Sequence, residues 1–496
     1  MAPPVADTVV ESMDAVPLKA PRGTGVMIRL DDIARRTKDN KEILIVFANK
    51  VYDLTKWAKF HPGGDLAVLH MNGRDATDAI IAYHPEWVMD KKMPHFCVGE
   101  LAPSERSSSS KVSIGYRQLD EKIRKLGLYN TNYSYFIREL LKFVVLFVAG
   151  VYLVLRHPNV YGVLGSALSF ATLWWQAAFY AHDVPVAAPD VAHQRLRSAP
   201  LLAVSGSLHS ADPGHSGITH DRWTDTVMGI CLGNYVGGLS VGWWKKNHNV
   251  HHIITNHPEH DPDIQHMPFM AVTSKLMHNL YSTYYKRIME FDAVARVMIP
   301  IQHYTFYILL AFGRFNLYAN SFAYLLSKDR VPHRWLELGG LVVFWTWYPM
   351  LLSTLKAQPG LIVMHVLVSH MFTVILHIQI TLSHFGMDTS EVEGESFAEM
   401  ALRTTMDVDC PRYMDWFHGG LQFQVVHHMF PRVPRHNLRT IVPLVKEFAR
   451  EHGLTYHSYK FIKGNWVVLQ CLAKVADEVR ESMQAAMEKI DAEKNK

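Results

Sequence analysis

Residues 242–268 read GWWKKNHNVHHIITNHPEHDPDIQHMP, and residues 417–438 read FHGGLQFQVVHHMFPRVPRHNL. Each stretch holds three polar side chains at the spacing i, i+3, i+4, which places them on one face of a helix. These are His248, His251 and His252 in the first stretch, and Gln424, His427 and His428 in the second. One such helix is as often a polar surface as a metal site. Two of them, both beside apolar runs, predict a metal site.

Further histidines extend this set. His182 follows one apolar run, His384 follows another in the sequence QITLSHF, and His215 is a third candidate. Imidazole nitrogen suits iron, copper and zinc. The eight or nine candidate ligands exceed what one ion accepts, so we expect two metal ions. Three nearby histidines fall off the helical spacing and are expected in loops: His257, His260 and His266.

The composition excludes several classes of protein. Of 496 residues, 49% are hydrophobic and 19% are charged, which is too apolar for a disordered chain. The 50 basic and 46 acidic residues give a net charge of +4, so we expect no nucleic-acid partner. The four cysteines stand apart without motif spacing, which argues against a disulfide framework and against cysteine-ligated metals.

Four apolar runs predict transmembrane helices, since about 20 helical residues cross a bilayer core. They are residues 140–155, 158–181, 338–355 and 360–381. The glycine-rich run 226–244 and the short run 299–313 are interpreted as interfacial. We therefore expect residues 134–496 to form an all-α multi-pass membrane domain with about four transmembrane helices plus interfacial helices.

The charge pattern predicts which side of the membrane holds the histidines. A basic segment precedes the first run, and short basic segments of this kind stay in the cytosol. It comprises Arg117, Lys122, Arg124, Lys125 and Arg138. The N-terminus shows no apolar run of signal-peptide length, so the first domain is expected in the cytosol as well. An even number of crossings between the histidine clusters then keeps all of them on the cytosolic side.

The N-terminal part carries a second pair of histidines. Residues 57–87 read WAKFHPGGDLAVLHMNGRDATDAIIAYHPEW, and FCVGEL follows at 96–101. This stretch resembles the cytochrome b5 family. The resemblance implies a small α+β domain with His61 and His84 as the two axial ligands of haem b. An iron held from both faces has no open position for oxygen, so such a haem transfers electrons.

The remaining parts of the N-terminal third are expected to surround this haem domain. We assign residues 25–101 to the haem domain, 1–24 to a flexible tail and 102–133 to a linker. The serine-rich start of the linker, residues 102–113, is expected to be a flexible tether. His70 and His95 are expected to be ordinary surface histidines.

Together, the two halves resemble a front-end membrane desaturase of fatty-acyl or sphingolipid substrates, fused to cytochrome b5, over about residues 25–460. The resemblance implies two iron ions, O2 as co-substrate and a location in the endoplasmic reticulum membrane. It also implies NADH-derived electrons, delivered to the haem by an NADH-dependent flavin reductase. The implied iron ligands are His182, His215, His248, His251, His252, His384, Gln424, His427 and His428.

The choice of substrate depends on two details. The extended stretch NHPEHDPDIQH and the valine at Val426 look most like fungal delta-8 sphingolipid desaturases. The expected reaction is therefore desaturation at delta-8 of the long-chain base of ceramide or glucosylceramide. The alternatives are a delta-6 or delta-5 acyl-lipid desaturase, a hydroxylase with the same metal centre, and a membrane-tethered haem electron carrier whose desaturase half is inactive.

One stretch departs from the family pattern. The family reads HDAGH where this chain has His182-Asp183, then residues 184–213, then Gly214-His215. The 30 intervening residues include four prolines and no aromatic residue, and they show no helical or strand periodicity. A family-specific loop is one interpretation. Our hypothesis is a translated intron, because exchanging one codon for 30 preserves the reading frame.

Overall fold

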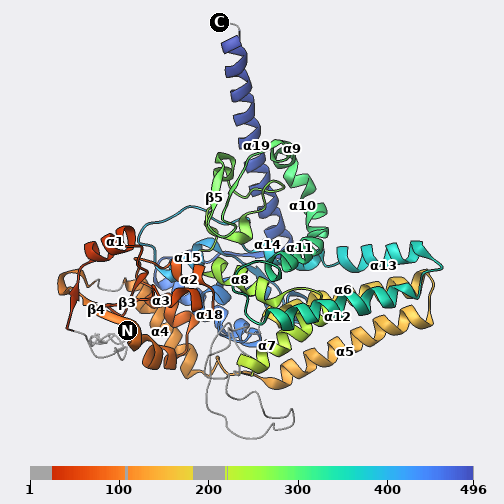
Figure 1. Ribbon diagram of the computed structural model, residues 1–496, viewed down its shortest axis with the longest axis horizontal. Helices are drawn as coiled ribbons and strands as arrows, with labels where there is room; N and C mark the ends of the chain where they lie inside the picture. The colour runs from red at the N-terminus through yellow and green to blue at the C-terminus, as the bar shows by residue number, and fades with distance from the viewer. Residues whose placement is uncertain (1–24, 107–109, 183–217, 220–221, 495–496) are drawn as a thin grey trace, which may run out of the picture.

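The computed structural model describes residues 25–106, 110–182, 218–219 and 222–494. Figure 1 shows a small N-terminal domain at one end, a long lobe of parallel helices at the other, and a helical body between them. The C-terminal helix α19 (Phe461–Lys494) projects away from this body. Residues 184–213 and the tail 1–24 lie outside the described residues.

The N-terminal domain is built around a four-stranded sheet. The strands lie in the order β1 (Met27–Ile28), β4 (Cys97–Leu101), β3 (Lys50–Asp53), β2 (Leu44–Phe47). Ala48 and Asn49 join β2 to β3 with φ angles of 51° and 60°, as a two-residue hairpin turn requires. The helices are α1 (Leu30–Asp39), α2 (Asp65–Leu69) and α3 (Thr77–Tyr83).

Helix α4 (Lys111–Lys125) occupies much of the predicted linker. Ser110 caps the helix by accepting a hydrogen bond from the backbone N–H of Ser113 at 3.0 Å. Tyr116, Leu119 and Ile123 are buried in a core shared with helices of the second half. The prediction of a flexible tether is therefore wrong from Ser110 onward, because serine acts there as a helix cap. Residues 107–109 lie outside the described residues.

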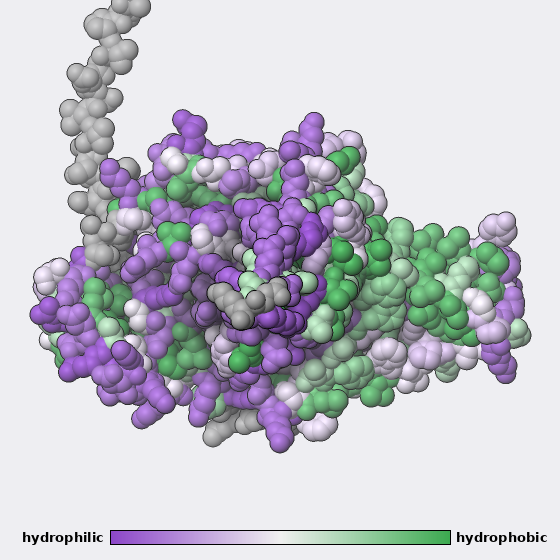
Figure 2. Space-filling view, turned by 90° about the horizontal axis from the view of Figure 1, so that it is seen from above, coloured by the Kyte–Doolittle hydropathy of each residue, from purple (hydrophilic) through white to green (hydrophobic). Residues whose placement is uncertain are grey.

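Four long helices form the lobe on the right of Figure 1. They are α5 (Tyr133–Arg156), α6 (Val160–His182), α12 (Arg334–Ser353) and α13 (Pro359–Met371), and α14 (Val374–Leu382) continues the last. The outer face of α5 is apolar, with Leu141, Val144, Val145 and Val148 all more than half exposed. Figure 2 shows hydrophobic residues over the lobe on the face turned to the viewer, as a lipid-facing surface would have.

Three helical segments of the described residues are long and apolar enough to cross a membrane: Ala293–Ala311, Arg334–Ser353 and Pro359–Leu382. The last two coincide with predicted spans. The first segment combines α9 (Ala293–Met298) and α10 (Gln302–Ala311). It begins six residues before the run 299–313, which we expected to be short and interfacial. In Figure 1 this run lies across the direction of α12 and along α19. The predicted count of four spans is not confirmed.

The helical body carries most of the histidines. It contains α7 (Arg222–Ile230), α8 (Val241–Ile253), α11 (Gly313–Leu325), α15 (Phe397–Thr404), α16 (Asp415–His418), α17 (Gln424–Met429) and α18 (Arg435–Glu451). A π-helical turn, Cys231–Val236, interrupts the glycine-rich run between α7 and α8. Two small sheets complete the body: β5 (Leu280–Ser282) with β6 (Arg287–Met289), and β7 (Asp407–Asp409) with β8 (Ser458–Lys460).

Candidate haem and metal centres

His61 and His84 face each other in the N-terminal domain. Their ring centres lie 6.0 Å apart. Two imidazoles that bind one ion from opposite sides, each at about 2 Å, have ring centres roughly 6 Å apart. His61 donates its Nδ1–H to the carbonyl of Gly64 at 3.0 Å, and His84 donates to Ile80 at 3.2 Å. These bonds fix the tautomer in which Nε2 would bind the iron, so the pair fits a haem.

Helix α8 brings the first histidine motif into the body. Ser240 caps it by accepting a hydrogen bond from the backbone N–H of Trp243 at 3.0 Å. His251 and His252 are each only 1% exposed. Buried polar side chains need partners, so burial of this helix face favours a ligand over a solvated surface.

Cluster 1 consists of His182, His248, His252 and His427, and one ligand atom of each lies within 4.8 Å of the others. His248 Nε2 is 3.1 Å from His182 Nε2 and 2.9 Å from His252 Nε2. Two nitrogen ligands at right angles, each about 2.1 Å from one ion, lie about 3.0 Å apart. The geometry of cluster 1 therefore fits a metal ion bound by imidazoles.

Cluster 2 consists of His251, His384 and His428. One ligand atom of each of these residues lies within 4.8 Å of the others. The His251 ring centre lies 4.5 Å from that of His384 and 5.0 Å from that of His428. His384 Nδ1 is buried and has no hydrogen-bond partner among the described residues. An orphaned buried nitrogen of this kind is costly unless a metal ion occupies the position.

The two clusters adjoin one another. His251 and His252 are neighbours on α8, and His427 and His428 are neighbours on α17. The rings of His252, from cluster 1, and His428, from cluster 2, stack with centres 4.0 Å apart. The arrangement suits two neighbouring ions better than one.

Two acidic residues that sequence reasoning missed lie behind cluster 2. His251 Nδ1 donates to Asp261 at 2.8 Å and lies 3.7 Å from Asp263. Burial opposes the charged form of His251, but the two carboxylates outweigh it and raise its pKa to about 9. Asp261 also accepts the backbone N–H of Asn256 at 2.7 Å. The carboxylate therefore fixes the orientation of the His251 ring, as in many metal sites.

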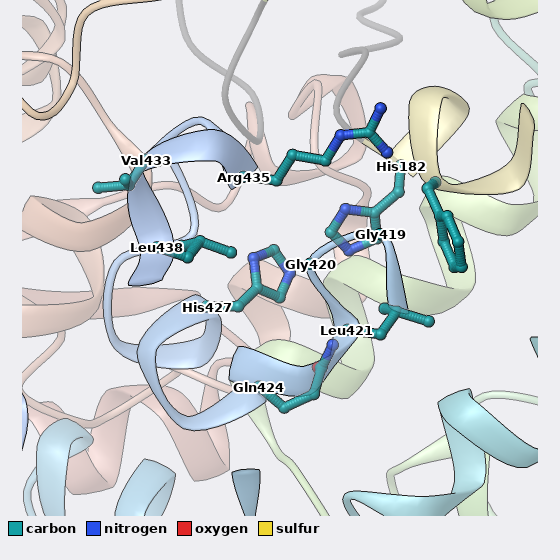
Figure 3. Close-up of a pocket in the computed structure, with 10 residues that line it drawn as sticks. His182, Gly419, Gly420, Leu421, Gln424, His427, Val433, Arg435 and Leu438 are labelled. Atoms are coloured by element: carbon teal, nitrogen blue, oxygen red, sulfur yellow. The ribbon is translucent and has the colours of Figure 1, made fainter. Parts of the chain in front are cut away.

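Gln424 lines a pocket beside cluster 1. The pocket wall includes His182, His427 and Arg435. Figure 3 shows the rings of His182 and His427 turned toward each other, with Gln424 on an adjoining wall. Gln424 thus lines the same pocket as two cluster 1 histidines, and its side chain also lies beside His384 of cluster 2.

Five other histidines singled out from the sequence lie apart from the two clusters or outside the described residues. His215 lies outside the described residues, so its predicted position beside His182 is not tested. His257 and His260 stack on each other with ring centres 4.1 Å apart, away from both clusters. His70 is half-buried, with its ring 4.6 Å from that of His260. The expectation that His70 is a surface residue is wrong, because the second half of the chain covers it; His95 is exposed.

Comparisons with known proteins agree with this geometry. Residues 29–102 match the cytochrome b5-like haem/steroid binding domain, and residues 199–460 match the fatty acid desaturase family. The chain belongs to the fatty acid desaturase family, as a membrane-associated oxidoreductase with an N-terminal cytochrome b5-like domain. Membership implies haem in the first domain and iron in the second.

Individual relatives cover almost the whole chain. A delta 8-(E)-sphingolipid desaturase of Lachancea kluyveri is 35% identical, over 90% of this chain and 92% of its own length. One of Emericella nidulans is 36% identical, over 88% and 92%. Delta(8)-fatty-acid desaturase 2 of Arabidopsis thaliana is 35% identical, over 93% and 95%.

Proposed function

We propose that this chain is a di-iron, O2-dependent desaturase that introduces a double bond at delta-8 of the long-chain base of ceramide or glucosylceramide. One observation supports the chemistry above all others. Seven histidines from distant parts of the chain meet in two adjoining clusters, while a haem-type histidine pair lies in the same chain.

Each cluster would hold one iron. His182, His248, His252 and His427 would bind the first ion, and cluster 2 would bind the second. Gln424 would complete the shell from α17, and His215 from the segment outside the described residues. Bound iron supplies the activation of O2 that breaks unactivated C–H bonds.

The protein's own residues orient the metals and exclude water. Asp261 holds the Nδ1 proton of His251 and so presents Nε2 to cluster 2. Val426, between Gln424 and His427 on α17, is fully buried and adds an apolar surface there. The overall reaction removes two hydrogen atoms from the lipid and reduces O2 to two waters. It therefore needs two electrons and two protons, and a haem held by His61 and His84 would supply the electrons one at a time.

The relatives support the choice of a sphingolipid substrate. Those of Lachancea kluyveri and Emericella nidulans are named for sphingolipid desaturation at delta-8. All three relatives are named for delta-8, which favours that position over delta-6 or delta-5, and the two fungal names favour the long-chain base over an acyl lipid.

The electron supply and the location are part of the same proposal. An NADH-dependent flavin reductase would reduce the haem, in the endoplasmic reticulum membrane. The basic residues that precede α5, including Arg117 and Arg124, favour a cytosolic position for the haem domain and both clusters.

Lipid analysis tests this function. The chain is expressed in a yeast that lacks delta-8 desaturation, and sphingoid bases and fatty acids are both scored for new double bonds. We expect a new double bond at delta-8 of the long-chain base, and none in cells that carry His428→Ala. New double bonds in fatty acids alone would support the acyl-lipid alternative and contradict the proposal.

A further inference from the structure

The haem domain is docked on the segments that carry the metal clusters. Asn249, between His248 and His251 on α8, donates from Nδ2 to the carbonyl of Gly63 at 3.0 Å. Arg432, which follows α17, donates from Nη1 to the carbonyl of His84 at 2.7 Å. Both haem-ligand loops are therefore hydrogen-bonded to chain segments adjoining the metal-binding histidines.

Apolar contacts fill the rest of this interface. Leu66 of α2 packs with Val250 and Ile254. Ala67 and Ala79 pack with Ile253, which ends α8. Close packing of this kind leaves little space for water between the domains.

Tyr83 makes the most direct connection. Tyr83 is the last residue of α3 and immediately precedes the haem ligand His84 in the chain. Its ring lies edge-to-face on His252 of cluster 1, with centres 6.2 Å apart and planes at 90°. The Tyr83 ring also packs edge-to-face on Phe397, with centres 6.1 Å apart. The Tyr83 ring thus packs against a cluster 1 histidine, one residue along the chain from the haem ligand His84.

Helix α4 also holds the haem domain against the second half of the chain. Tyr116 of α4 donates its hydroxyl hydrogen to the carbonyl of Met429, the last residue of α17, at 2.7 Å. Arg117 pairs with Asp78 of α3 at 2.7 Å. Helix α4 therefore packs against both halves of the chain and helps to keep Tyr83 against His252.

We propose that Tyr83 is the positioning residue for electron transfer within the chain: its ring links the haem held at His84 to cluster 1 at His252. The inference rests on the proposed function. In each transfer one electron leaves a ferrous haem, which becomes ferric, and reaches the cluster iron. Two transfers, with two protons from solvent and two hydrogen atoms from the lipid, reduce one O2 to two waters.

The test measures the haem directly. The full chain, purified in lipid nanodiscs and reduced without oxygen, is mixed with O2 and a ceramide while haem absorbance is followed. We compare Tyr83→Leu, which removes the ring, with Tyr83→Phe, which keeps the ring and loses only the hydroxyl. Tyr83→Met is a second ring-free variant whose flexible side chain fills the space.

The proposal predicts a separation between these variants. Haem reoxidation is slower than in the wild type in both Tyr83→Leu and Tyr83→Met, and stays near the wild-type rate in Tyr83→Phe. The low-spin haem spectrum, the haem midpoint potential and the iron content stay unchanged in all three, which a merely structural role would not explain. Wild-type rates in the ring-free variants, or equal slowing in Tyr83→Phe, would overturn it.

A further control separates this proposal from the proposed function. In His428→Ala, loss of cluster 2 iron is expected to stop product formation and slow haem reoxidation even though Tyr83 is intact. If haem reoxidation in the wild type is the same as in His428→Ala, the haem does not supply the metal centre, and both proposals fail. If haem reoxidation is slow in His428→Ala but proceeds at the wild-type rate in the ring-free Tyr83 variants, the proposed function stands and the role of Tyr83 is refuted.

Discussion

Replacing Asp261 with asparagine tests how cluster 2 holds its metal. Asp261 is fully buried and accepts hydrogen bonds from His251 Nδ1–H at 2.8 Å and from the backbone N–H of Asn256 at 2.7 Å. Asparagine keeps the size of the side chain but removes its charge and one acceptor oxygen. The backbone N–H of Asp263 donates to the other carboxylate oxygen at 2.9 Å, so an asparagine cannot accept all three hydrogen bonds, and His251 keeps at best a neutral and weaker partner.

The expected loss follows from the burial of this pair. Carboxylate partners of metal-binding histidines contribute about 10–100-fold to metal affinity, or about 1.4–2.7 kcal/mol. No water reaches the 0% exposed Asp261 to replace the acceptor, so we expect a value near the upper end.

A chelator titration measures this loss. Non-haem iron is quantified in the purified full chain against increasing chelator, with haem absorbance as the internal standard. Asp329→Asn is the matched control, since Asp329 is 54% exposed and its carboxylate forms an ion pair with Lys246 at 3.4 Å. We expect Asp261→Asn to lose iron at a chelator concentration about 100-fold lower than the control does. Equal iron retention in both variants would refute the role of Asp261.

Three other predictions concern the haem, the pH dependence of stability and the interrupted motif. His84→Ala should abolish the low-spin bis-histidine spectrum in the full chain and leave membrane insertion intact; a retained spectrum would mean a wrong ligand. Burial raises the pKa of Asp407 to about 7 although Tyr456 and the backbone of Val425 hydrogen-bond it. The folded state therefore favours the protonated carboxyl, and stability falls as the pH rises from about 4 to 7 by up to about 1.4 kcal/mol per unit. Thermal unfolding of Asp407→Asn should lack this component, and an identical pH profile would contradict it. A chain with one alanine in place of residues 184–213 should form more product than the long form, whereas a mature transcript that retains all 30 codons, with full activity of the long form, would refute the intron hypothesis.

The sequence was most informative where the relevant spacing is local. The i, i+3, i+4 pattern on α8 and α17 required only helical geometry, and both helices form there. His384 was a weaker candidate, because its approach to His251 depends on the packing of distant segments.

Contacts that depend on tertiary packing could not be predicted from local spacing. Asp261 reaches His251 because the chain folds back after α8, and nothing in its spacing distinguishes it from other loop carboxylates. His70 would face solvent in an isolated haem domain, but His260 covers it. For α4 a signal was present, since Tyr116, Leu119 and Ile123 recur at helical spacing, but serine composition outweighed it.

Iron analysis of the purified full chain tests the central claim most directly. Total iron is measured against haem, which is quantified separately from its absorbance. We expect about three irons per chain, one in the haem and two held by the histidine clusters. A total of about one iron per chain, all of it in the haem, would contradict a di-iron desaturase and favour a membrane-tethered electron carrier.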